Sequence, residues 1–166
     1  MKTLLIIRHA KSSWDDAAMS DFDRPLNERG KRDAPAMARR LLKAGIDIDR
    51  FVASPAKRAR QTAELFVQGF GKKEKHIQFI PELYHAAPAV FEEVVDGLDD
   101  ADDTVAIFSH NPGITAFVNT LTTARLDNMP TCAVFAAKCD TTHWKDFRQA
   151  KPQFWFFDYP KADGRD

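Results

Sequence analysis

The sequence predicts an α/β protein, a three-layer sandwich with a mostly parallel central sheet flanked by helices. Three short apolar runs, at residues 4–7, 51–53 and 105–108, have the continuous hydrophobic character of strands buried on both faces of a parallel sheet. Segments with helical spacing follow these runs, and strands that alternate with helices build a layered sheet. The pattern changes towards the carboxyl end of the chain, which predicts a different edge of the sheet there.

The first half of the chain predicts two helices between its strands. Asn27 is a suitable N-cap for a helix that runs towards Lys43. Pro35 removes one backbone hydrogen bond from that helix, so we expect a kink or a late start. A second strand at residues 51–54 leads into a helix that spans about residues 57–68.

The second half begins with the same alternation. A short strand at residues 77–80 precedes a helix with an apolar face over residues 90–98. The acidic run at 99–103 is expected to be a solvated loop. Residues 104–109 form the clearest strand of the sequence, and a helix at 113–121 follows it.

Two further strands are predicted near the carboxyl end, at residues 132–137 and 154–158. The aromatic residues at 154–157 make both faces of the last strand apolar, which predicts that they belong to the core.

Length and composition bound the class of protein. The 166 residues suit one domain, predicted over residues 1–166. Basic and acidic residues balance at 24 each, which argues against a partner that is nucleic acid or a membrane surface. Cys132 and Cys139 fit neither a disulfide framework nor a zinc pattern. Because the sequence contains neither a signal-peptide core nor an apolar membrane span, we expect a cytoplasmic protein.

Basic side chains follow three of the predicted strands. Arg8 and His9 follow the first, Arg58 lies shortly after the second, and His110 follows the strand at 104–109. The carboxyl ends of parallel strands meet at one edge, so we expect these side chains to lie together. A guanidinium group can hold two phosphoryl oxygens, and an imidazole either donates to them or attacks phosphorus. The pattern predicts a site for a phosphoryl group, and that chemistry requires neither a metal nor a cofactor.

Simpler interpretations exist for some of these residues. Arg58 could belong to a solvated helix start at 57–60, but cations at that end oppose the helix dipole and favour an anion nearby. His76 and His143 carry no motif and are expected at the surface. Trp14 either forms a wall of the site or packs elsewhere.

The segment Arg8-His9-Ala10-Lys11-Ser12-Ser13-Trp14 resembles the Arg-His-Gly motif of the histidine phosphatase superfamily, which includes phosphoglycerate mutases. Residues 54–63 and 109–113 are similar to its second and third motifs. The short chain, the alanine variant of the first motif and the segment Leu83-Tyr84-His85-Ala86 resemble the SixA-type phosphohistidine phosphatases in particular. The resemblance extends to about Leu121 and implies a phosphoglycerate mutase-like fold.

The resemblance also implies a role for each matched residue. His9 would be the nucleophile that becomes phosphorylated. The residues that would bind the phosphoryl group and its transition state are Arg8, Arg58 and His110. Ser12 and Asn111 are implied as additional substrate contacts.

The implied substrate follows from a departure from the wider family. Its mutases and broad phosphatases carry a glutamate that protonates an alkoxide leaving group, whereas here His85 aligns with it and Glu82 lies just upstream. An imidazole leaving from phosphohistidine needs less help, because the nitrogen–phosphorus bond is labile. We therefore expect the partner to be a histidine-phosphorylated protein. The alternatives are a broad small-molecule phosphatase that uses His85 or Glu82 as acid, and a phosphate-binding module without turnover.

Overall fold

The computed structural model describes residues 1–161, within which six strands form one sheet in the order β3-β2-β4-β1-β5-β6. The strands are β1 (Lys2–Arg8), β2 (Arg50–Ala53), β3 (Ile77–Phe79), β4 (Thr104–Ser109), β5 (Val134–Cys139) and β6 (Gln153–Asp158). A single domain over 1–166 stays a prediction, and residues 162–166 lie outside the described part of the chain.

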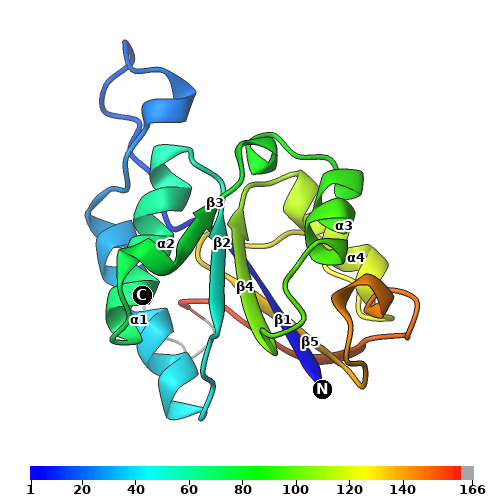
Figure 1. Cartoon of the computed structure of the whole chain (residues 1–166). Helices are drawn as coiled ribbons and strands as arrows, with labels where there is room; N and C mark the ends of the chain where they lie inside the picture. The colour runs from blue at the N-terminus through cyan, green and yellow to red at the C-terminus, as the bar shows by residue number, and fades with distance from the viewer. Residues whose placement is uncertain (162–166) are drawn as a thin grey trace.

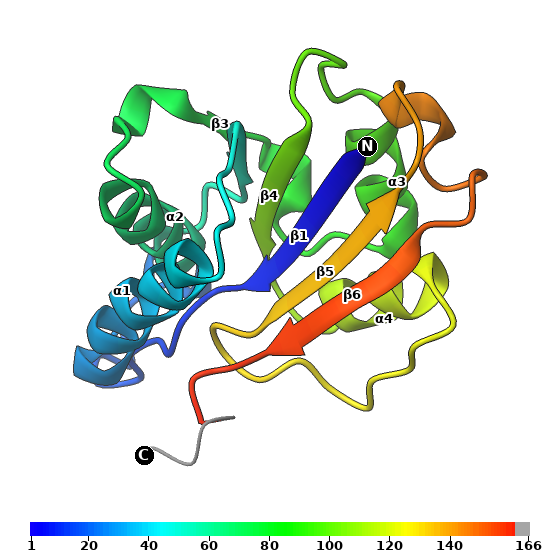
Figure 2. The ribbon, with the colours of Figure 1, turned by 90° about the horizontal axis from the view of Figure 1, so that it is seen from below.

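In the described residues 1–161, four α-helices cover the two faces of this sheet. They are α1 (Glu28–Lys43), α2 (Lys57–Gly69), α3 (Pro88–Asp96) and α4 (Gly113–Leu121). Figure 1 shows α1 and α2 on one side of the strands and α3 and α4 on the other, and Figure 2 shows the same division from below. The strands from β3 to β1 are parallel, whereas β5 is antiparallel to both β1 and β6. The predicted three-layer, mostly parallel architecture is confirmed.

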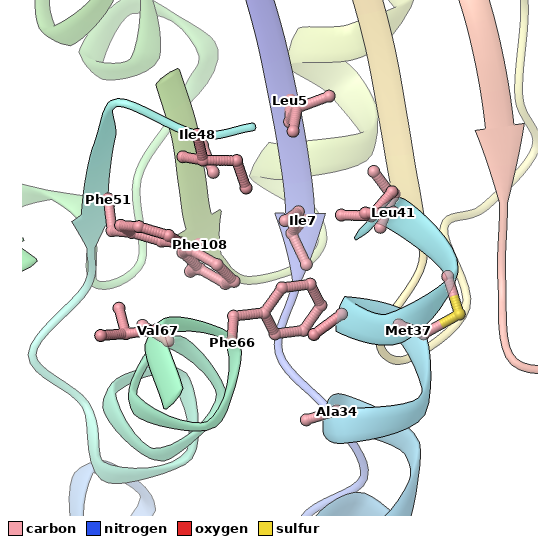
Figure 3. Packing of buried hydrophobic residues seen from close by; sticks show 14 of the residues in the cluster. Leu5, Ile7, Ala34, Met37, Leu41, Ile48, Phe51, Phe66, Val67 and Phe108 are labelled. Atoms are coloured by element: carbon pink, nitrogen blue, oxygen red, sulfur yellow. The ribbon is translucent and has the colours of Figure 1, made fainter. Parts of the chain in front are cut away.

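The central strand β1 contributes to two cores. Leu5 and Ile7 face α1 and α2, where they join Phe66 in one cluster (Figure 3). Leu4 and Ile6 point to the other face and join the cluster formed with α3 and α4. All four side chains are fully buried. Burial on both faces explains why the strand is continuously apolar instead of alternating.

The start of α1 follows its sequence signals. The Asn27 side chain accepts a hydrogen bond from the Gly30 backbone N–H at 2.9 Å, which confirms it as the N-cap. The helix begins at Glu28 and continues through Pro35, so the late start is wrong, while the alternative, a kink at Pro35, stays a prediction. Within residues 1–161, no helix combines the length and apolar character needed to cross a membrane.

The last two strands differ from the prediction. The strand expected at 132–137 begins two residues later, because Cys132 has a φ of 61° that a strand does not accommodate. Only part of the aromatic run in β6 packs on the core: Phe156 and Phe157 are partly buried against the two clusters, whereas Phe154 and Trp155 are 44% and 39% exposed. The reason is that β6 is an edge strand, paired on one side only (Figure 2).

The acidic run after α3 is also more than a solvated loop. The Asp103 carboxylate pairs with the buried Lys2 ammonium at 3.0 Å, and the Asp102 carbonyl accepts from the Trp144 indole at 2.8 Å. The Asp100 carboxylate accepts from the Trp144 backbone N–H at 2.8 Å. The run thus connects the start of β1 to a short 3₁₀-helix, η4 (Trp144–Asp146).

Candidate active site

The carboxyl edge of the sheet, uppermost in Figure 1, brings the three basic motifs together. Arg8 ends β1 and pairs in register with Ser109, the last residue of β4. The His9 backbone N–H donates to the Ser109 carbonyl at 3.1 Å, and the His9 and His110 ring centroids lie 5.2 Å apart. Arg58, the second residue of α2, faces them. Arg8, His9, Arg58 and His110 all line one cavity of about 270 Å³.

The hydrogen bonds of His9 fix its tautomer. Its Nδ1 lies 2.7 Å from the Ala10 carbonyl oxygen, which can only accept, so Nδ1 carries the proton. Burial lowers the pKa of His9 well below its ordinary value, and the ring is therefore neutral. Its Nε2 is then unprotonated and accepts a hydrogen bond from the Arg58 Nε–H at 3.3 Å. A neutral imidazole with an unprotonated Nε2 inside a cationic pocket is equipped to attack an electrophile once the Arg58 Nε–H turns to a phosphoryl oxygen.

A buried threonine on α2 supports this arrangement. The Thr62 hydroxyl accepts from the Ala10 backbone N–H at 2.9 Å and donates to the Arg58 carbonyl at 2.7 Å. One side chain thus connects the loop of His9 to the first turn of α2, which carries Arg58. No sequence motif indicated this role for Thr62.

Two buried polar atoms of the cavity residues have no hydrogen-bond partner within residues 1–161, namely His110 Nδ1 and Arg8 Nε. The other ring nitrogen of His110 bonds the Ser54 hydroxyl at 2.7 Å, and Arg8 Nη1 donates to the Met129 carbonyl at 2.9 Å. Burial, aided by the charge of Arg58, lowers the pKa of His110 to about 3. Buried polar atoms without partners are costly unless a ligand satisfies them, and a tetrahedral oxyanion would do so.

Sequence reasoning missed Asp21, which lies in the segment between β1 and α1 that projects at the upper left of Figure 1. Arg58 donates to the Asp21 carbonyl at 2.7 Å and to its Oδ2 at 3.1 Å. Oδ2 also accepts from the Tyr84 hydroxyl at 2.7 Å, and Oδ1 accepts from Arg24 at 3.2 Å. Partial burial raises the pKa of Asp21, but the Tyr84 hydrogen bond and the Arg58 charge outweigh it and hold the pKa well below its usual range. Asp21 also lines the cavity and is an ionised carboxylate there.

Ser12 and Asn111, the predicted additional substrate contacts, both already have hydrogen-bond partners in the protein. Ser12 lines the cavity, but its hydroxyl already accepts from Arg24 at 2.7 Å. Asn111 also lines it, while its side-chain amide donates to Asn128 and Met129. Both residues therefore help to hold the walls of the site.

The two acid candidates separate in space. His85 lines the cavity, with a side chain that is 68% exposed and a ring centroid 3.9 Å from that of Tyr84. Glu82 is exposed on a short 3₁₀-helix, η3 (Pro81–Leu83), and is not among the lining residues. Trp14 forms part of the wall, 72% exposed, with the Arg24 guanidinium carbon 3.6 Å from its ring centroid.

Two imidazoles and two guanidinium groups at the carboxyl edge of an α/β sandwich supply the chemistry expected of an enzyme site of the phosphoryl-binding class. The model of the histidine phosphatase superfamily (branch 1) matches residues 4–87, and the chain belongs to that superfamily. It is a phosphatase.

Similar proteins agree with this membership. An uncharacterised chloroplast protein of Arabidopsis thaliana, At3g52155, is 28% identical over 163 residues, which cover 93% of this chain and 74% of that protein. A protein assigned as the phosphohistidine phosphatase SixA of Agrobacterium tumefaciens has a TM-score of 0.81 at 24% identity, covering 96% of this chain and 98% of that one. The protein histidine phosphatase SixA complexed with tungstate has a TM-score of 0.80 at 24% identity, covering 95% and 97%. In its fold, the chain is of the SixA type.

Proposed function

We propose that this phosphatase removes the phosphoryl group from phosphohistidine in a protein, through a phosphohistidine intermediate on His9. The observation that carries the proposal is the hydrogen bond from His9 Nδ1 to the Ala10 carbonyl at 2.7 Å, because it leaves Nε2 as the nucleophilic nitrogen. The unprotonated Nε2, which accepts a hydrogen bond from Arg58, belongs to a neutral ring inside a cavity lined by Arg8 and Arg58.

The reaction would occur in two displacements. In the first, the His9 Nε2 lone pair forms a bond to phosphorus while the substrate's nitrogen–phosphorus bond breaks, and its electron pair returns to the substrate imidazole. In the second, a water oxygen forms a bond to phosphorus while the Nε2–phosphorus bond breaks, and both water protons stay on the oxygens of the released phosphate. His9 leaves as a neutral imidazole, because its Nδ1 proton is still held by Ala10. Arg8, Arg58 and His110 would surround the phosphoryl oxygens in both steps.

The choice of phosphohistidine as substrate rests on the acids that the cavity lacks. Among the described lining residues the one carboxyl group is Asp21, which is ionised and cannot protonate an alkoxide. Glu82 lies outside the cavity. An imidazole that departs neutral needs no such acid, whereas an alkyl phosphate without one loses about 10²–10⁴-fold in rate. The SixA likeness supports the same substrate class.

A broad small-molecule phosphatase is the second candidate, and the position of His85 favours it. His85 lines the cavity with an exposed ring and could protonate an ester oxygen. A phosphate-binding module without turnover is the weakest candidate, because a module that only binds has no use for an unprotonated His9 Nε2. A cytoplasmic location also stays a prediction.

Phosphate release from a histidine-phosphorylated domain, an aryl phosphate and a panel of sugar phosphates tests the proposal, with His9→Ala as the blank. We expect fast release from the phosphohistidine substrate alone, and an acid-labile phosphoenzyme in wild type but not in His9→Ala. Faster release from the esters would refute the phosphohistidine proposal and favour the second candidate. Turnover that persists in His9→Ala would refute the nucleophile.

A further inference from the structure

The Asp21 carboxylate occupies an unusual position for a negative charge, since every other ionisable side chain that lines the cavity within residues 1–161 is basic. It is fixed there by three donors, Arg58 and Tyr84 on Oδ2 and Arg24 on Oδ1. Arg24 Nη2 also lies 3.2 Å from Oδ1 as an ion-pair contact. A carboxylate offers about four lone-pair positions, so the three hydrogen bonds leave room for one further donor. The side chain is 42% exposed, which keeps that capacity accessible from the cavity mouth.

The Arg58 contacts show how Asp21 and a phosphoryl group can both be accommodated. Asp21 takes the two terminal nitrogens, Nη1 through its carbonyl and Nη2 through its carboxylate. The Nε edge of the same guanidinium group faces His9 Nε2 instead. A phosphoryl group bound at the Nε edge therefore has a negatively charged neighbour. That charge would repel the phosphoryl group, so a favourable contact must come from another part of the substrate.

The leaving group of the proposed substrate is an imidazole ring. A phosphorylated imidazole departs readily only when its second ring nitrogen carries a proton, because the breaking bond then returns its electron pair to a neutral ring. For phosphorylated His9 this proton is held by the Ala10 carbonyl. The substrate imidazole in the first displacement has the same requirement, and the protein must supply a second acceptor for it. The phosphate esters have no such N–H group, and their departing oxygen becomes negative.

We infer that the Asp21 carboxylate is the specificity-determining acceptor for that N–H group: it favours a protonated phosphoimidazole over phosphate esters. The inference rests on the proposed function and deepens it, since it names the residue that selects a nitrogen leaving group. The step stays balanced, because the proton remains on the departing ring and Asp21 only accepts a hydrogen bond from it. Repulsion between Asp21 and a developing alkoxide acts in the same direction.

The test compares two small substrates in each variant, phosphoimidazole and an aryl phosphate, through the ratio of their kcat/KM values. Asp21→Asn removes the charge and is expected to lower that ratio about 10–100-fold, the range of a lost charge-assisted hydrogen bond. Asp21→Glu keeps the charge and is expected to keep the ratio within about 3-fold of wild type. Asp23→Asn is the matched control, because Asp23 is exposed in the same segment and does not line the cavity.

The ratio of the two kcat/KM values distinguishes a role of Asp21 in substrate selection from a role in positioning Arg58. If Asp21 only positions Arg58, both substrates lose rate together, the ratio in Asp21→Asn stays at the wild-type value, and the inference is overturned. A fall of the ratio in Asp21→Asn with no change in Asp23→Asn supports it. The proposed function fails separately, if wild-type enzyme itself prefers the aryl and sugar phosphates.

Discussion

Replacing Thr62 by valine removes a buried hydroxyl while nearly conserving the shape of the side chain. The hydroxyl accepts from the Ala10 N–H at 2.9 Å and donates to the Arg58 carbonyl at 2.7 Å. The carbonyl lies within α2 and keeps a helical partner, so its loss matters little, but the buried Ala10 N–H is left without an acceptor. An unsatisfied buried donor costs about 1–3 kcal/mol. We therefore expect the unfolding free energy of Thr62→Val to fall by about that amount.

Urea denaturation followed by circular dichroism measures this loss, and the melting temperature should drop by about 2–4 °C per kcal/mol for a chain of this size. Thr120→Val is the control: Thr120 donates to the Phe117 carbonyl at 2.6 Å but receives no backbone N–H within residues 1–161. It should change stability by less than about 0.5 kcal/mol. If the two variants are equally stable, the reasoning about the Ala10 N–H is wrong.

Further predictions concern pH, packing and metals. Because the pKa of His110 is about 3 in the folded protein against an ordinary 6.5, the unfolded chain binds a proton that the folded one does not. The unfolding free energy should therefore fall as pH drops below about 6.5, by up to about 1.4 kcal/mol per pH unit from this residue. Gly113→Ala should destabilise the protein by about 1–3 kcal/mol or more, since a Cβ there would lie 1.8 Å from the Ala86 carbonyl oxygen. A chelator should leave the rate of phosphate release unchanged.

Each of these has its own check. Denaturation curves at pH 7, 6 and 5 should show a weaker slope in His110→Gln, and an unchanged slope would contradict the assignment to His110. Gly97→Ala is the control for packing, because its nearest neighbour would be 3.4 Å away, and equal effects of the two glycine variants would refute the steric argument. Inhibition by a chelator, reversed by an added metal, would contradict the metal-free scheme.

The sequence predicted what depends on local pattern and on strand order. His9, Arg58 and His110 were found because each follows a strand and the carboxyl ends of parallel strands meet. Asp21 could not be found in this way, since its partners Arg58 and Tyr84 lie 37 and 63 residues away in the chain.

Two errors have a related origin. The pattern at Phe154 and Trp155 shows that both faces are apolar but not whether a strand is central or at an edge, and pairing with β5 on one side left β6 at the edge. The acidic run looked solvated because its partner, Lys2, lies about a hundred residues earlier in the sequence and only the folded sheet brings the two together.

The stacking of Trp14 against Arg24 gives the protein an optical reporter of its own. Trp14 is 72% exposed on the wall of the cavity, whereas Trp144 is fully buried beside the amino end of β1. Arg24 also contacts Asp21, so an oxyanion that enters the cavity changes the electric field at the Trp14 indole. We therefore expect emission from Trp14 to follow ligand occupancy, and the difference between wild type and a Trp14→Phe variant isolates it from the emission of Trp144 and of Trp155, which is 39% exposed on β6.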